Sequence, residues 1–210
     1  WYIGKFIHRT RKLSARRFLL ASSLCVNLGL LGYFKYGEFL LDNFIALLET
    51  FQIEFHPAAP DVVLPVGISF YTFQSLSYTF DIYRRKLRPW HSFADFAMFV
   101  TFFPQLVAGP IVRAADFLPQ LKEPRQADSR QFGWGLCMLT TGLFQKIILA
   151  DTLLAPVADK VYGQPGNAEF MDAWAGTLAI SGQIFFDFTG YSNCAIGSSL
   201  CLEMTLTDNF

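Results

Sequence analysis

Long uncharged stretches of apolar residues constrain this chain more than any other feature of its sequence. Residues 18–34 contain no charged side chain, and neither do residues 62–80. Of all 210 residues, 52% are hydrophobic and only 16% are charged, whereas soluble domains usually carry about 25% charged residues. The apolar residues come in blocks rather than in the stripes of an amphipathic soluble helix. We therefore expect these segments to lie in lipid.

Basic residues gather beside the apolar blocks. Residues 1–17 hold basic side chains and no acidic one, and a second basic cluster, residues 84–88, follows residues 62–80. The formal net charge of +0 argues against a nucleic-acid-binding protein, although a local basic patch for nucleic acid is the alternative interpretation. Basic loops next to apolar segments are typical of the cytoplasmic side of a membrane. We interpret residues 1–17 as a basic cytoplasmic leader.

The apolar blocks predict membrane segments by their length. A spanning helix needs about 20 mainly apolar residues to cross about 30 Å of hydrocarbon. We predict four main membrane segments, at residues 18–34, 62–80, 132–154 and 173–202. Residues 37–55 carry acidic side chains between apolar ones and suggest an amphipathic helix at the outer surface or on the rim of the bundle.

Residues 93–112 differ from the other apolar blocks because Pro104, Gly109 and Pro110 interrupt them. Basic residues on both flanks indicate a segment that dips into the membrane and returns, rather than one that spans it. Broken backbone at membrane depth is tolerated where protein or a water-filled cavity covers it, so this re-entrant candidate is a possible wall of a site. The expected fold class is all-α, a polytopic transmembrane helix bundle with a broken, re-entrant segment.

Asp187 is the one charged residue within residues 173–202. A carboxylate that faces lipid costs about 2.5–3.5 kcal/mol, so Asp187 must face the bundle or a polar cavity. Gln183, Tyr191 and Ser192 add polar groups nearby. Two interpretations stay open: a substrate channel, or a hydrogen-bonded structural Asp that fixes a helix break or pairs with an Arg. One long helix and two segments meeting near Gly190 fit the sequence equally well.

The remaining ionisable residues give weaker signals. Arg113 follows the broken segment, where its guanidinium could hold a phosphate or carboxylate of a ligand or extend to lipid headgroups. His8, His56 and His91 lie in the leader or in loops and are interpreted as solvated. The four cysteines have no metal-binding spacing, so we predict neither a disulfide nor a metal site.

Four motifs resemble signatures of the membrane-bound O-acyltransferase (MBOAT) family. They are LPVGISFYTFQ at residues 64–74 with 78 and 81–84, FPQLVAGP at 103–110 with Arg113, KIILADTL at 146–153, and FDFTGYS at 186–192 with 195–197. Residues 32–36, GYFKY, are similar to the family's alginate O-acetyltransferase branch. The matches run in order along nearly the whole chain, so the sequence resembles the central part of such an enzyme.

The resemblance implies a multi-pass enzyme of the bacterial cytoplasmic (inner) membrane. Such an enzyme takes an acyl group from a cytoplasmic thioester donor such as acetyl-CoA, with no bound cofactor. It passes the group through a membrane-embedded tunnel to a hydroxyl of an exported polysaccharide such as alginate, with periplasmic partner proteins. On this hypothesis the residues that line the tunnel or bind substrate are Gln105, Arg113, Gln183, Asp187, Tyr191 and Ser192.

The family's two histidine segments, Trp-Arg-Arg-Trp-His and Gly-Leu-Trp-His-Gly, are absent from these residues. The resemblance implies that both follow Phe210, and none of the three histidines present matches the family's histidine. We therefore expect no catalytic residue within residues 1–210, and we expect the chain alone to be inactive. It is interpreted as a single MBOAT-type membrane domain, residues 1–210, truncated at both ends.

Three alternative functions remain. Broken helices and a buried Asp also occur in secondary transporters, although no repeated half is visible here. A non-catalytic assembly subunit of polysaccharide export is a second alternative. Within the enzyme class, a related branch transfers D-alanine to teichoic acid from a carrier-protein thioester.

Overall fold

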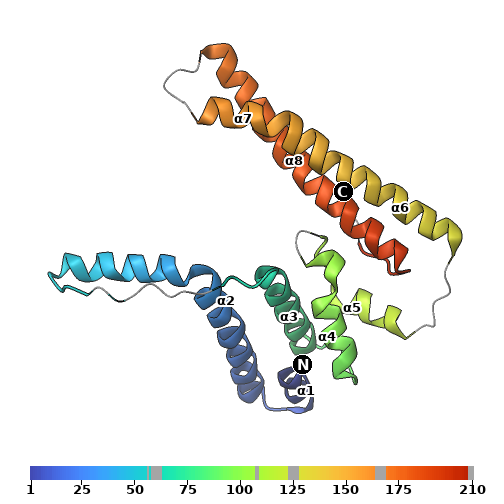
Figure 1. Cartoon of the computed structure of the whole chain (residues 1–210). Helices are drawn as coiled ribbons and strands as arrows, with labels where there is room; N and C mark the ends of the chain where they lie inside the picture. Colours follow the sequence, from blue (N-terminus) through green and yellow to red (C-terminus); the bar gives the residue numbers. More distant parts are fainter. Residues whose placement is uncertain (56, 58–62, 107–108, 123–127, 164–168, 208–210) are drawn as a thin grey trace. The chain divides into compact units, whose positions relative to one another are not determined.

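The computed structural model describes residues 1–55, 57, 63–106, 109–122, 128–163 and 169–207. All regular elements in these ranges are helical and none is a strand, which confirms the all-α fold class (Figure 1). The chain divides into two compact units. The first comprises Trp1–Thr101 and Arg113–Leu118, and the second comprises Phe102–Val112 and Pro119–Phe210.

The first unit contains α1 (Tyr2–Arg9), α2 (Leu13–Thr50), α3 (Ile68–Tyr83), α4 (Phe93–Thr101) and the short α5 (Ala114–Phe117). Its core is aromatic and aliphatic. The rings of Phe96 and Phe117 lie on either side of Phe99, with centroids 6.3 and 5.6 Å away. Phe99 and Phe117 are fully buried, so α4 and α5 are joined by closely packed rings.

Residues 1–17, predicted as a leader, are part of this folded unit. They form α1 and the start of α2, and α1 packs on α3. Ile7 and Ile82 are both fully buried, and a Cβ at Gly4 would lie 2.8 Å from Ile82 Cδ1. The absence of a side chain at Gly4 therefore lets the two helices approach closely. The cytoplasmic placement of these residues stays a prediction.

Residues 18–34 and 37–55, predicted as two helices, belong largely to one helix of 38 residues, α2. The acidic residues of the second segment do not end the helix, because Glu is a good helix former and no proline lies between Leu13 and Thr50. Figure 1 shows α2 changing direction part-way along its length. The helix ends where Gln52 adopts a positive φ of 59°.

Residues 62–80 were predicted as one membrane segment, but the helix there begins only at Ile68 and continues to Tyr83. Pro65 and the left-handed Gly67, with φ 76°, precede it and keep the backbone from continuing the helix toward the N-terminus. At 16 residues, α3 is about 24 Å long, which is shorter than the hydrocarbon core of a bilayer. Residue 62 lies outside the described residues.

The second unit is built on two long antiparallel helical stretches. In one, α6 (Ser129–Leu143), η3 (Phe144–Leu154) and α7 (Ala155–Tyr162) follow one another without a break. The other is α8 (Phe170–Cys201), which packs along all three (Figure 1). The predicted segments 132–154 and 173–202 are therefore helical. Since α8 runs continuously through Gly190, the two-segment interpretation is wrong.

Two helices in the described residues are long and apolar enough to cross a membrane, Leu13–Thr50 and Ser129–Tyr162. They include the predicted segments 18–34 and 132–154. With 32 residues, α8 has sufficient length as well, but its apolar character is weaker. Membrane crossing at residues 62–80 and 173–202 stays a prediction.

The predicted break within residues 93–112 is present. The helix α4 ends at Thr101, and a single 3-10 turn, η1 (Phe103–Gln105), follows, with Pro104 inside it. A proline lacks the N–H that an α-helix needs at this point, which explains the break. Whether the segment dips into a membrane stays a prediction.

Candidate functional site

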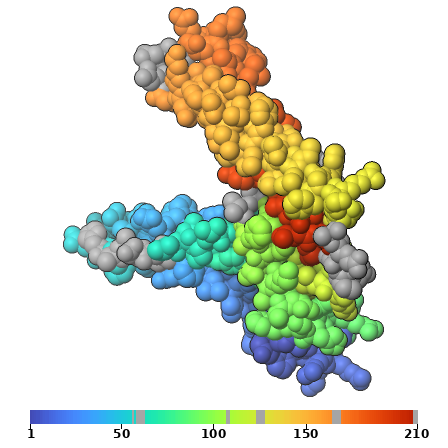
Figure 2. All heavy atoms as spheres, turned by 45° about the vertical axis from the view of Figure 1, so that its right-hand side comes forward, coloured from blue at the N-terminus to red at the C-terminus, as the bar shows by residue number. Residues whose placement is uncertain are grey.

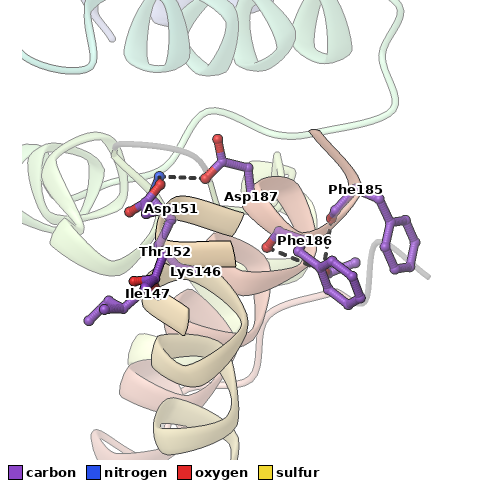
Figure 3. A network of polar contacts seen from close by, with 8 residues as sticks. Lys146, Ile147, Asp151, Thr152, Phe185, Phe186 and Asp187 are labelled. Atoms are coloured by element: carbon purple, nitrogen blue, oxygen red, sulfur yellow. Dashed lines mark hydrogen bonds and ion pairs between the residues drawn. The ribbon is translucent and has the colours of Figure 1, made fainter. Parts of the chain in front are cut away.

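Three charged side chains meet where η3 packs on α8 (Figure 3). Lys146 Nζ lies 2.7 Å from Asp151 Oδ1 and 2.5 Å from Asp187 Oδ1. The lysine side chain is 22% exposed, and the carboxylates are 47% and 36% exposed. Asp187, predicted as a site residue, thus has a cationic partner. We call Lys146, Asp151 and Asp187 the ion network.

The unusual helix type of η3 brings Lys146 and Asp151 together. In an α-helix, residues five apart point about 140° away from each other around the axis. In a π-helix, hydrogen bonds join residues five apart, and Thr152 Oγ1 donates to the carbonyl of Ile147 at 2.7 Å (Figure 3). The π-helix of η3 spans 11 residues, and π-helical turns occur frequently at functional sites.

Glycines set the distance between α6 and α8. A Cβ at Gly142 would lie 2.6 Å from the carbonyl oxygen of Gly190 and 2.7 Å from Cys194 N. A Cβ at Gly197 would lie 2.5 Å from Leu139 N and 2.7 Å from the carbonyl oxygen of Gly135. Since the atoms met are backbone atoms, no side chain can move aside. Glycine at these positions permits the close contact that places Asp187 against Lys146.

Further polar contacts extend the ion network along the same two helices. Asn193 Nδ2 donates to Gln145 Oε1 at 2.8 Å, again joining α8 to η3. The ring of Tyr191, a predicted site residue, lies 5.2 Å from Lys146 Nζ, a cation–π distance. The structure therefore gathers Asp187 and Tyr191 around a lysine that the sequence did not single out.

Gln105 and Ser192, two further predicted residues, are buried in the same unit. Gln105 is 0% exposed on η1, and Ser192 is 2% exposed on α8. The turn η1 packs on α8, and a Cβ at Gly109 would lie 2.9 Å from the Cβ of Ala195. The turn η1 and Gly109 of the broken segment thus lie against the helix that carries Asp187.

The last two predicted residues are placed differently. Gln183 lies on α8 one turn before Asp187 and is half-buried. Arg113 precedes α5, belongs to the first unit and is exposed. Two cavities of the second unit, of about 540 and 330 Å³, flank the start of α6, and none of the six predicted residues lines either of them.

The amide, hydroxyl and charged groups in and around the ion network can hold hydroxyl-bearing ligands by hydrogen bonds. No group of three His, Cys, Asp or Glu side chains in the described ranges is arranged to hold a metal ion. Lys146 and Asp151 were not predicted as site residues, although both lie in the KIILADTL motif. In an α-helix the two side chains would point to different faces, so their sequence spacing gives no sign that they meet.

Comparison with known sequences agrees with the motifs. The sequence model of the membrane-bound O-acyltransferase family matches residues 84–209. The chain belongs to this family. The match includes the broken segment, all of η3 and all of α8, so the ion network and the buried Gln105 lie within the family's shared region.

Individual relatives share more than a third of the residues. The chain is 38% identical over 200 residues to a protein of Azotobacter vinelandii named probable alginate O-acetylase AlgI, covering 95% of the chain and 39% of the relative. A protein of the same name from Pseudomonas putida is 40% identical, with 95% and 40% covered. A Helicobacter pylori protein named peptidoglycan O-acetyltransferase is 34% identical over 236 residues, with 100% and 44% covered. The chain thus spans about two fifths of the length of these relatives.

Proposed function

We propose that the protein containing this chain is a membrane O-acyltransferase that acetylates hydroxyls of an exported polysaccharide. One observation carries the proposal: relatives at 38% and 40% identity over 95% of the chain are named alginate O-acetylases. We propose a cytoplasmic thioester such as acetyl-CoA as the donor. The protein would be a multi-pass protein of the bacterial inner membrane that acts with periplasmic partner proteins.

These residues would then serve as scaffold and tunnel wall. The packing of η1 on α8 and the polar side of α8 support this role, because they place Gln105, Gln183 and Tyr191 on packed helices rather than on loops. The ion network would hold α8 against η3. The catalytic histidine would lie in a part of the protein outside residues 1–210.

A second acceptor has specific support. The relative from Helicobacter pylori matches the whole chain and is named for peptidoglycan. Alginate and peptidoglycan both present sugar hydroxyls, so the same transfer would serve either polymer. Transfer of D-alanine to teichoic acid and a non-catalytic role in export are the remaining alternatives.

The test uses a strain that produces the full-length protein and a deletion of its gene. Ester-bound acyl groups are released by alkali from each exported or cell-wall polymer and identified as acetate or D-alanine. We expect acetate on one polysaccharide to disappear in the deletion strain and to return on complementation. Loss of D-alanine instead would replace the acetyl proposal. Unchanged esters together with loss of polymer export would support the assembly or transport alternative.

A further inference from the structure

The first unit contains a basic pocket that the acyl-transfer proposal does not use. It has a volume of about 590 Å³. Its lining residues are Lys5, His8, Arg9, Arg85, Arg88, Pro89 and His91. No acidic side chain is among them. A hollow lined almost entirely by cationic and imidazole groups is suited to an anion.

Two segments distant in the sequence form this pocket, and direct contacts fix them to each other. Trp1 Nε1 donates to the carbonyl of Trp90 at 2.9 Å, and Lys5 Nζ donates to the carbonyl of His91 at 3.4 Å. Tyr78 Oη accepts a hydrogen bond from Trp90 N at 3.0 Å. In Figure 2 the dark blue atoms of α1 lie against green atoms of the same unit. These hydrogen bonds fix the two segments that form the pocket relative to each other.

Arg85 occupies a backbone conformation that favours glycine. Its φ is 63°, and it follows α3 in a Schellman motif, in which Lys86 N donates to the carbonyl of Asp81 and Arg85 N to that of Ile82. Helices commonly place glycine at this position, because other residues are strained there. An arginine at a glycine position suggests that its side chain has a use.

The cations of the pocket are not neutralised within the described residues. None of Lys5, Arg85 and Arg88 forms an ion pair with a carboxylate there. His8 Nδ1 is buried and has no hydrogen-bond partner among those residues. Repulsion between unpaired like charges costs energy, and an anion would relieve it. His8 also lines the pocket, so its unpartnered nitrogen lies close to the basic side chains.

We propose that this pocket binds a phosphate group. Guanidinium groups match phosphate oxygens by paired, charge-assisted hydrogen bonds. Three arginines, Arg9, Arg85 and Arg88, line the pocket, and Lys5 adds an ammonium group. Both basic clusters belong to the side of the membrane that we predict to be cytoplasmic. There the phosphate can come from an anionic lipid headgroup or from a soluble phosphate compound, and both sources offer the same chemistry.

The experiment compares two charge-matched variants of the full-length protein purified in detergent without phospholipid. The pocket variant is Arg85→Gln with Arg88→Gln. The control variant is Arg84→Gln with Lys86→Gln, which removes two charges from the same loop at residues that do not line the pocket. Binding of inorganic pyrophosphate is measured by calorimetry. Binding of phosphatidylglycerol and of phosphatidylcholine is measured by native mass spectrometry.

We expect the wild type to bind pyrophosphate or phosphatidylglycerol, and the pocket variant to bind at least about tenfold more weakly. The control should stay within about threefold of the wild type. Preference for phosphatidylglycerol identifies a lipid headgroup as the source, and preference for pyrophosphate identifies a soluble compound. Equal losses in the two variants, or no binding by the wild type, would overturn the proposal. Unfolding midpoints of both variants exclude misfolding as the cause.

Discussion

Lys146 Nζ on η3 lies 2.5 Å from Asp187 Oδ1 on α8. The same ammonium group also contacts Asp151 within η3, so one cation joins two helical elements and serves two carboxylates. Replacing it leaves both carboxylates without their cation, and Asp151 lies in a helical segment apolar enough to cross a membrane.

Lys146→Met should lower the free energy of unfolding by about 1–2 kcal/mol, since the partly exposed carboxylates place the network between surface and buried ion pairs. Lys160→Met is the matched control, because Lys160 is exposed on α7, and it should change stability little. Adding Asp187→Asn to Lys146→Met should recover part of the loss. Thermal unfolding of the full-length protein measures all three effects, and an unaltered midpoint in Lys146→Met would contradict the bridging role.

Gly142→Ala should force α6 and α8 apart. The new Cβ would lie 2.6 Å from a backbone oxygen, and such overpacking costs about 1–3 kcal/mol. Gly133→Ala in the same helix has no atom within 4 Å of its Cβ position. There the better helix propensity of alanine should be neutral or add up to about 1 kcal/mol. Similar unfolding midpoints for the two variants would show that the close contact is not needed.

Arg85→Gly should stabilise the protein while weakening anion binding. Glycine adopts the positive φ at this position without strain, which should add about 1 kcal/mol to the free energy of unfolding. Loss of the guanidinium should weaken pyrophosphate or phosphatidylglycerol binding. The two effects are measured by thermal unfolding and by the binding assays above. A stabilised variant with wild-type binding would remove Arg85 from the phosphate site.

If the protein is the proposed acyltransferase, Asp187→Asn distinguishes a structural role of Asp187 from a direct role in acyl transfer. Because Asp187 has an ion partner, we expect less folded protein but unchanged acetyl transfer per folded molecule. Asp159→Asn on the exposed side of α7 is the control. Folded protein is quantified by size-exclusion chromatography, and acetyl ester by alkaline release. Normal yield with transfer reduced about tenfold or more would instead place Asp187 at the substrate.

Much of the fold could be predicted from the positions of apolar residues and of prolines. Apolar blocks with few or no charges located the long helices, and Pro104 located the break after α4. The predicted helix boundaries were wrong where the charge pattern and the backbone preferences of the residues point to different ends. The acidic residues after Gly37 suggested a separate helix, yet α2 runs on to Thr50 because nothing there breaks it. The opposite error occurred at α3, where Pro65 and Gly67 make the helix start later than predicted.

The candidate site was predictable only in part, for geometric reasons. Asp187 stands out because its charge lies in an apolar segment, and Tyr191 follows one turn later on the same helix. Lys146 and Asp151 come together through a π-helix, which an α-helical period does not anticipate. The basic pocket could not be found from composition, because its two halves are about 80 residues apart in the sequence and meet through α1 and α3.

The glycines of α6 and α8 bear on the register in which the two helices pack. Gly135 faces Gly197 and Gly142 faces Gly190, so both helices carry glycines seven residues apart. A slip of seven residues, about 10.5 Å along the axis, would bring Gly142 opposite Gly197 and keep one close glycine contact. It would also carry Asp187 away from Lys146. The glycine spacing by itself is therefore compatible with both registers, whereas the Lys146–Asp187 ion pair and the Asn193–Gln145 hydrogen bond form only in the observed one.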